Sequence, residues 1–208
     1  MEKAYISLGS NCTVASQLNR AEKRTVSYPL DWLFTYHSVY KLFENDFKDY
    51  LNTEIKPIDT NLWPDAPSST QIECNKDYST IFMHQDYEAG QVYREVIQRR
   101  VDRLLDTLRE QKKEVVFIRR GHPEDFHRLI PLVGFTEFEN TLSEREDMER
   151  LVEVLKRKYP NLKFKIHLFY NCKCKAFEDC DTDHLRTKHI PGRWAETDDI
   201  LYSELTVL

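Results

Sequence analysis

One cysteine of this chain stands where its thiol can do chemistry, in the stretch YISLGSNCTVASQL over residues 5–18. The apolar run over residues 4–9 predicts a β-strand that stops at a Gly-Ser-Asn turn, and apolar residues with helical spacing follow it. Cys12 therefore falls in the first turn of a predicted helix, where the helix dipole and unpaired backbone amides favour the thiolate. This position predicts a nucleophile.

The residues just before Cys12 can support such a nucleophile. Ser10 and Asn11 are candidate N-caps of the helix, and the amides of its first turn can hold a developing oxyanion. The alternative is that Cys12 only packs in the core, because free cysteine is among the most buried residue types.

A cysteine nucleophile needs a base, and His84 is the best placed of the seven histidines. It closes a predicted strand, and the acidic residue Asp86 follows closely in the segment MHQDY. Cys12, His84 and a carboxylate, either Asp86 or Asp31, would make a Cys-His-acid arrangement. The alternative for Asp31 is a structural one, in which it caps backbone amides of a turn that faces the core.

Two further groups of residues could bind ligands. Arg119 and Arg120 close the apolar run EVVFIRR and could clamp a phosphate or a carboxylate at a strand end. The segment NCKCKAFEDCDTDH supplies a set of candidate zinc ligands, which are Cys172, Cys174, Cys180 and His184. Their spacing is not that of a standard zinc site, so a loop with solvent-facing thiols is the alternative to a structural zinc. We expect no other cofactor, because the chain has no Walker-type loop and no glycine-rich dinucleotide motif.

The hydrophobic pattern predicts strands that alternate with helices. Strands are expected over residues 4–9, 78–84, 114–120 and 162–170, and helices from residue 12 and over 38–51, 88–111 and 143–158. This alternation is typical of βαβ units, and it predicts an α/β fold with a mostly parallel sheet and helices on both faces. The polar, proline-containing segment 52–78 is expected to be a long loop and a possible lid. The candidate residues follow strands, and the carboxyl ends of parallel strands are where functional groups gather.

Composition limits the class of protein. The 208 residues, with 40% hydrophobic and 31% charged residues, predict a single globular domain over 1–208. A net charge of −5 lacks the basic excess of a general nucleic-acid binder. We expect a cytoplasmic protein without a membrane partner, because no signal peptide and no apolar stretch of membrane-spanning length is present. The odd number of five cysteines also fits poorly with a secreted disulfide framework.

Several motifs, taken in order along the chain, resemble one family. SLGSNCTVASQL, YPLDWLF, FMHQDY, QRRVDRLL and VVFIRR are similar to the putative papain-like cysteine peptidases over roughly residues 4–120. The resemblance implies Cys12 as the nucleophile, His84 as its partner, and Asp31 with Trp32 as part of the site. It also implies an α+β papain-like fold as the alternative to the α/β fold. Leu30 stands where the family pattern has Phe, and Gln85 separates the histidine from the following aspartate.

Together these observations favour a cysteine hydrolase or acyl transferase that acts on peptide or isopeptide bonds of a peptide or protein substrate. Two alternatives remain open from the sequence. One is a non-catalytic protein that binds a small anionic ligand at the strand ends, and the other is an interaction module stabilised by zinc.

Overall fold

The structure is a computed structural model that describes residues 2–10, 12–35, 39–57, 71–82, 90–121, 144–170, 179–191 and 197–208. The strands are β1 (Lys3–Ser7), β2 (Phe34–Thr35), β3 (Glu54–Pro57), β4 (Gln71–Asn75), β5 (Thr80–Phe82), β6 (Glu114–Arg120), β7 (Phe164–Tyr170), β8 (Cys180–Asp181) and β9 (Leu185–His189). The helices are α1 (Cys12–Arg20), α2 (Val39–Glu44), α3 (Gly90–Glu110), α5 (Glu144–Lys158) and α6 (Thr197–Thr206). None of the helices in these ranges is long and apolar enough to cross a lipid bilayer.

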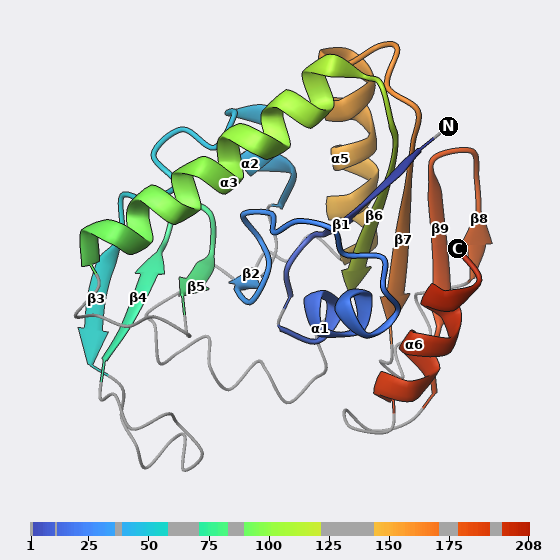
Figure 1. The fold of residues 1–208 in the computed structure, drawn as a ribbon, viewed down its shortest axis with the longest axis horizontal. Coiled ribbons are helices and arrows are strands. Elements are labelled where there is room, and N and C mark those ends of the chain that lie inside the picture. The colour runs from blue at the N-terminus through green and yellow to red at the C-terminus, as the bar shows by residue number, and fades with distance from the viewer. Residues whose placement is uncertain are drawn as a thin grey trace.

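The main sheet has five strands in the order β1-β6-β7-β9-β8 (Figure 1). Strands β1, β6, β7 and β9 run parallel to one another, and β8 pairs antiparallel with β9 at the edge. Ser7 lies opposite Ile118, which in turn lies opposite His167. The carboxyl ends of β1, β6 and β7 therefore lie side by side, and the predicted α/β fold with a mostly parallel sheet is confirmed.

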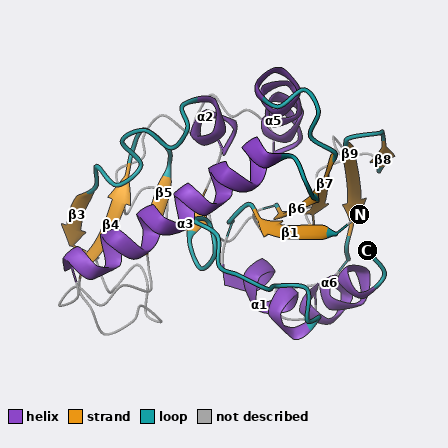
Figure 2. Cartoon of the chain, turned by 45° about the horizontal axis from the view of Figure 1, so that its top comes forward, coloured by secondary structure: helices purple, strands orange, loops and turns teal. Residues whose placement is uncertain are grey.

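Helices cover both faces of this sheet, as predicted (Figure 2). On one face, α3 and α5 bury the apolar stripes that their sequences show, and on the other face α1 and α6 enclose a smaller core. The first core includes Leu104, Leu108, Leu151, Leu155, Phe117 and Ile166, and the second includes Val14, Leu18, Ile118, Phe169, Leu201 and Leu205. Because the side chains of a strand alternate between faces, neighbouring residues of β6 enter different cores.

A second sheet of four antiparallel strands, in the order β2-β5-β4-β3, stands beside the first. The sequence did not predict it, since β5 was expected to belong to the parallel alternation. The turn between β4 and β5 is too short for a crossover, so the two strands pair as a hairpin, with Asn75 opposite Thr80. Two strands, β3 and β4, lie within the segment 52–78, which the sequence predicted to be a loop. Residues 58–70 lie outside the described residues, so a lid stays a prediction.

The helix predicted over 38–51 is shorter than expected, because α2 ends at Glu44. Asp46, Phe47 and Asp49 have positive φ angles of 50°, 59° and 57° and form turns instead. The buried amide nitrogen of Asn75 donates hydrogen bonds to the carbonyl groups of residues 49, 50 and 52. These tertiary bonds satisfy carbonyl groups that a longer helix would otherwise bond within itself.

Candidate functional site

The chain makes a sharp turn between the end of β1 and the start of α1. Gly9 and Ser10 have φ angles of 75° and 82°, in the left-handed region that favours glycine. A Cβ atom on Gly9 would lie 2.2 Å from Oγ1 of Thr35, so glycine is also required by space. Cys12 is the first residue of α1, as the sequence predicts.

The Thr35 side chain, from β2, fixes this turn from the opposite side. Its hydroxyl accepts a hydrogen bond from the Ser10 amide at 3.0 Å and donates one to the Leu8 carbonyl at 3.0 Å. It also accepts a bond of 2.8 Å from Nη1 of Arg119. The backbone that leads to Cys12 is therefore held by side chains from two other strands.

Arg119 is fully buried, and its guanidinium group donates five hydrogen bonds to protein groups. Nε and Nη2 bond the two carboxylate oxygens of Glu144, each at 2.9 Å. Nη1 bonds the Leu8 carbonyl at 2.9 Å as well as Thr35, and Nη2 also bonds the Thr35 carbonyl at 2.8 Å. Because five such bonds use the five donors of an arginine, this geometry leaves Arg119 none for a ligand.

Arg120 points to the opposite face of the sheet, the face that α1 and α6 cover. Its residue surface is 1% exposed, and Nη1 pairs with Oδ1 of Asp198 at 2.8 Å. Asp198 lies in the first turn of α6 and is itself 34% exposed. The predicted anion-binding role at these strand ends therefore rests on Arg120 rather than on both arginines.

The Cys12 thiol is half-buried beside this ion pair. Burial raises the pKa of the thiol above its ordinary value, and Asp198 acts in the same direction. A backbone hydrogen bond and the Arg120 guanidinium lower the pKa, but by less. The helix N-terminus alone would lower the pKa of Cys12. The pKa is raised instead, because the cost of desolvating the thiolate outweighs the effect of the helix dipole.

Asp198 is not among the site residues that the sequence predicts. Its signal is the segment TDDILYSEL, in which two aspartates in a first turn precede apolar residues with helical spacing, a typical helix start. Nothing local in that segment indicates that its aspartate reaches a strand end far earlier in the chain.

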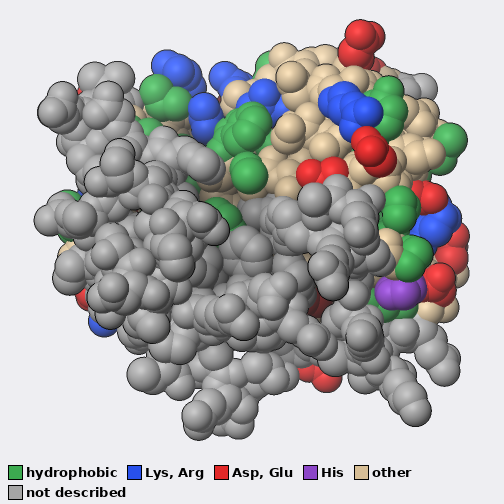
Figure 3. Space-filling view, turned by 90° about the horizontal axis from the view of Figure 1, so that it is seen from below, with side chains coloured by type: hydrophobic (Ala, Val, Ile, Leu, Met, Phe, Trp, Pro, Cys, Tyr) green, Lys and Arg blue, Asp and Glu red, His purple; other side chains and the backbone are tan. Residues whose placement is uncertain are grey.

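Ser10, predicted to support the oxyanion, is fully buried, and its Oγ has no hydrogen-bond partner among the described residues. Asn11 lies outside the described residues. Figure 3 shows the molecule from the side at which the parallel strands end, where acidic and basic side chains of described residues are both visible.

Asp31 and Trp32 lie in the tight turn before β2. Oδ2 of Asp31 accepts bonds from the Tyr28 amide at 3.0 Å and from Nε of Arg24 at 2.9 Å. Burial raises the pKa of the Asp31 carboxyl above its ordinary value, although these two donors oppose the rise. Trp32 has a φ of 66° and is 36% exposed, and the Arg24 guanidinium lies 5.9 Å from its ring centroid. These contacts are those of a capped turn, the structural role considered for Asp31.

His84 and Asp86 lie outside the described residues, so their pairing with Cys12 stays a prediction. The preceding strand β5 belongs to the antiparallel sheet, which corrects the expectation that His84 follows a parallel strand.

Half of the predicted zinc cluster is described. The Thr187 hydroxyl lies 3.3 Å from Sγ of Cys180, and the His184 ring stacks on Phe164 with centroids 4.6 Å apart. Cys172 and Cys174 are outside the described residues. Within the part of the chain that is described, no group of three or more metal-ligating side chains comes together, and zinc stays a prediction.

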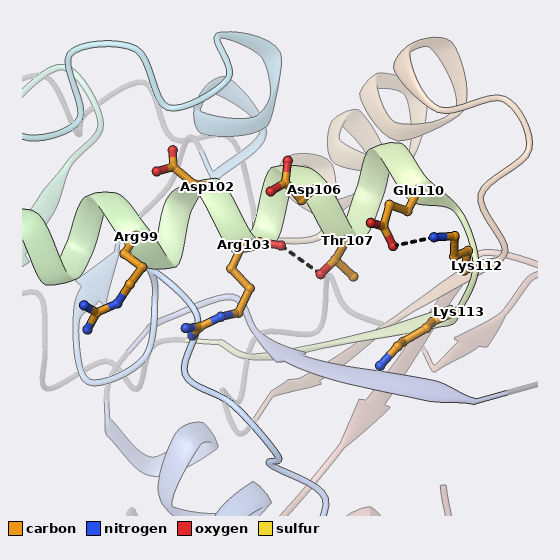
Figure 4. Close-up of a pocket in the computed structure, with 8 residues that line it drawn as sticks. All are labelled: Arg99, Asp102, Arg103, Asp106, Thr107, Glu110, Lys112 and Lys113. Atoms are coloured by element: carbon orange, nitrogen blue, oxygen red, sulfur yellow. Dashed lines mark hydrogen bonds and ion pairs between the residues drawn. The ribbon is translucent and has the colours of Figure 1, made fainter.

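A groove of about 460 Å³ runs along α3, and none of the residues that line it is a predicted site residue (Figure 4). Arg99, Arg103 and Lys113 project to one side of the helix in this view, and Asp102 and Asp106 to the other. Lys113 pairs with Glu2 at 2.6 Å and Arg103 donates to the Ser27 carbonyl at 2.6 Å. Lys112 also lines the groove and pairs with Glu110 at 3.3 Å. Since protein groups already bond three of the four basic side chains of the groove, the Cys12 region is the better candidate site.

A family model described as putative papain-like cysteine peptidase matches residues 3–173 of the chain. No curated protein and no solved structure matches the chain. The matched region includes the turn, Cys12, Arg119 and Arg120, whereas Asp198 lies beyond it.

Proposed function

Because the chain belongs to the family of putative papain-like cysteine peptidases, we propose that it is a cysteine hydrolase whose nucleophile is Cys12. The observation that carries this proposal is the position of Cys12, on the first turn of α1 and beside the buried Arg120 at the carboxyl edge of a parallel sheet. Catalytic groups of α/β proteins gather at such an edge.

The raised pKa of the Cys12 thiol favours a mechanism with a general base. Since the thiol is largely protonated at neutral pH, it needs a partner that removes its proton during attack. His84 is the partner that the sequence predicts, with Asp31 or Asp86 to orient the imidazole.

In this mechanism His84 takes the thiol proton while Sγ of Cys12 attacks the acyl carbon of a peptide or isopeptide bond. The tetrahedral intermediate collapses, the C–N bond breaks, and His84 returns the proton to the leaving amine. Water then attacks the thioester with His84 as base, which releases a carboxylic acid and the free thiol. Backbone amides at the start of α1 and the buried hydroxyl of Ser10 are the groups we assign to the oxyanion.

The test combines thiol labelling with hydrolysis. The wild-type protein should react with an electrophilic acyl-type probe and hydrolyse at least one member of a panel of peptide, isopeptide and ester substrates. Cys12→Ser should lose both activities, whereas Cys180→Ser, which changes another half-buried free thiol, should keep both. His84→Ala should slow hydrolysis strongly without unfolding the chain. Labelling of Cys12 with no hydrolysis of any substrate would refute the proposal.

A second candidate function is that of a non-catalytic protein that binds a small anion at Arg120. The buried guanidinium at the strand ends favours it, as does a thiol whose pKa is raised. If this function is correct, Cys12→Ser leaves the binding of carboxylate and phosphate compounds unchanged while Arg120→Gln weakens it.

A further inference from the structure

We propose that Asp198 controls the reactivity of Cys12, by holding the Arg120 guanidinium in an ion pair and by placing a negative charge beside the thiol. In this role Asp198 is a positioning residue, and α6 is the element that regulates the site. The inference deepens the proposed function and rests on it for its catalytic consequence.

The geometry of β6 brings Arg120 to the Cys12 side of the sheet. The Leu8 amide, at the exit from β1, donates to the Ile118 carbonyl at 2.8 Å. Arg120 follows Ile118 by two residues and so shares its face, the face on which α1 begins. A cation buried to this extent requires a counter-charge, which Asp198 supplies at 2.8 Å.

The position of Asp198 depends on the packing of α6 against α1. Leu201 and Leu205 enter the same small core as Val14 and Leu18. At the surface Asp199 pairs with Arg20, the last residue of α1, at 2.7 Å. The neighbouring aspartates of α6 therefore have different roles, since Asp199 joins two helices at the surface and Asp198 reaches the buried guanidinium.

Among the described residues, Arg120 from β6 and Asp198 from α6 are the charged groups that act on the Cys12 thiol. They act in opposite directions, because Arg120 favours the thiolate and Asp198 disfavours it. Asp198 also draws the guanidinium into a bond that competes with an interaction between Arg120 and a thiolate. Both effects add to burial, which is the largest cause of the raised pKa of the thiol.

This arrangement makes the thiol sensitive to any event that draws Asp198 away from Arg120. A shift of α6, or a cationic group of a substrate that pairs with Asp198, would weaken the effect of the Asp198 charge on the thiol, while Arg120 would continue to favour the thiolate. The site would then become more nucleophilic when it is occupied than when it is empty.

The test is the rate of alkylation of Cys12 by iodoacetamide as a function of pH, read by peptide mass spectrometry on the full chain. In Asp198→Asn the apparent pKa of the thiol should fall, and the rate at a pH below that pKa should rise by roughly threefold or more. Asp198→Glu, which keeps the charge, should remain close to wild type. Asp199→Asn is the matched control, since it removes an equal charge from the next residue of the same helix, one that pairs with Arg20 instead.

Circular dichroism and the urea midpoint of each variant show whether the fold is retained. An Asp198→Asn profile equal to that of wild type, an equal shift in Asp199→Asn, or a thiol that stays unreactive in every variant would overturn the inference. Hydrolysis is not part of the readout. A shifted profile in a protein with no hydrolytic activity would therefore refute the proposed function while leaving the control by Asp198 intact.

Discussion

Arg119 and Arg120 are adjacent on one strand, and the structure uses them in different ways. Arg119 makes five hydrogen bonds to protein groups on the α5 side of the sheet, where Glu144 is its main partner. Arg120 pairs on the other side with Asp198, a partly exposed carboxylate, next to a thiol. The pleat of the strand thus separates two identical side chains into a structural residue and a residue of the candidate site.

The largest expected effect is the loss of stability when the Arg119 network is broken. Arg119→Met leaves the buried carboxylate of Glu144 without its bidentate partner, and we expect a loss of about 3–5 kcal/mol in the free energy of unfolding. Arg120→Met should cost less, because water can reach Asp198, but it should change the alkylation profile of Cys12. Urea unfolding of both variants measures the difference. Equal losses in the free energy of unfolding would contradict the different roles of Arg119 and Arg120.

A smaller loss is expected when the turn that Arg119 supports is altered. Gly9→Ala places a Cβ atom 2.2 Å from Oγ1 of Thr35 at a φ of 75°, so the turn must open. We expect a loss of about 2 kcal/mol, together with a changed rate of Cys12 alkylation. Gly121→Ala is the control, since its nearest contact would be 3.4 Å and we expect a loss well below that of Gly9→Ala. A Gly9→Ala protein with wild-type stability would contradict the described turn.

The Arg119 side should also make stability depend on pH. The Asp147 carboxylate accepts bonds from the amides of Val39 and Tyr40, and burial with the nearby Glu144 raises its pKa from 3.8 to about 7. Between these two values the folded state binds more protons than the unfolded state, so stability falls as pH rises through this window. From pH 5 to pH 7 the fall attributable to Asp147 should be on the order of 1–2 kcal/mol.

Asp147→Asn tests this dependence, because an amide has no charge to bury. Urea unfolding of wild type and variant at several pH values should show the steeper fall in wild type. Parallel curves over the whole window would show that Asp147 does not carry the dependence.

The smallest effect on stability is expected on the Cys12 side. Since Oγ of Ser10 is buried and no described residue bonds it, Ser10→Ala should remain within about 0.5 kcal/mol of wild type. If the hydroxyl supports the oxyanion, the same variant lowers the rate of hydrolysis. A large loss of stability would instead place Ser10 with the structural residues of the other side.

Long periodic segments of this chain could be predicted from the sequence, and short segments with mixed composition could not. EVVFIRR was predicted as a strand over 114–120, which are the bounds of β6, and the helices 88–111 and 143–158 correspond closely to α3 and α5. In contrast, β9 has the sequence LRTKH, whose polar residues hide its place in the sheet. Its strand conformation comes from pairing with β7 rather than from its own pattern.

The candidate site could likewise be predicted only in part from the sequence. Cys12 could be found because a strand, a turn and a helix start surround it within a few residues. The different roles of the two arginines follow from the alternation along a strand, but their partners do not. Glu144 and Asp198 reach these arginines through the packing of helices, which no local pattern encodes.

The bonds of Arg119 also bear on how the chain folds. They join residues 111 and 84 positions apart along the chain, so the turn before Cys12 gains its full support only after distant segments have met. Contacts of such long range form slowly, because closing a large loop costs chain entropy. During folding the Cys12 thiol is therefore accessible to solvent, with ordinary reactivity, until these contacts form. Protection of Cys12 against alkylation during refolding should consequently appear late, together with the burial of the main core.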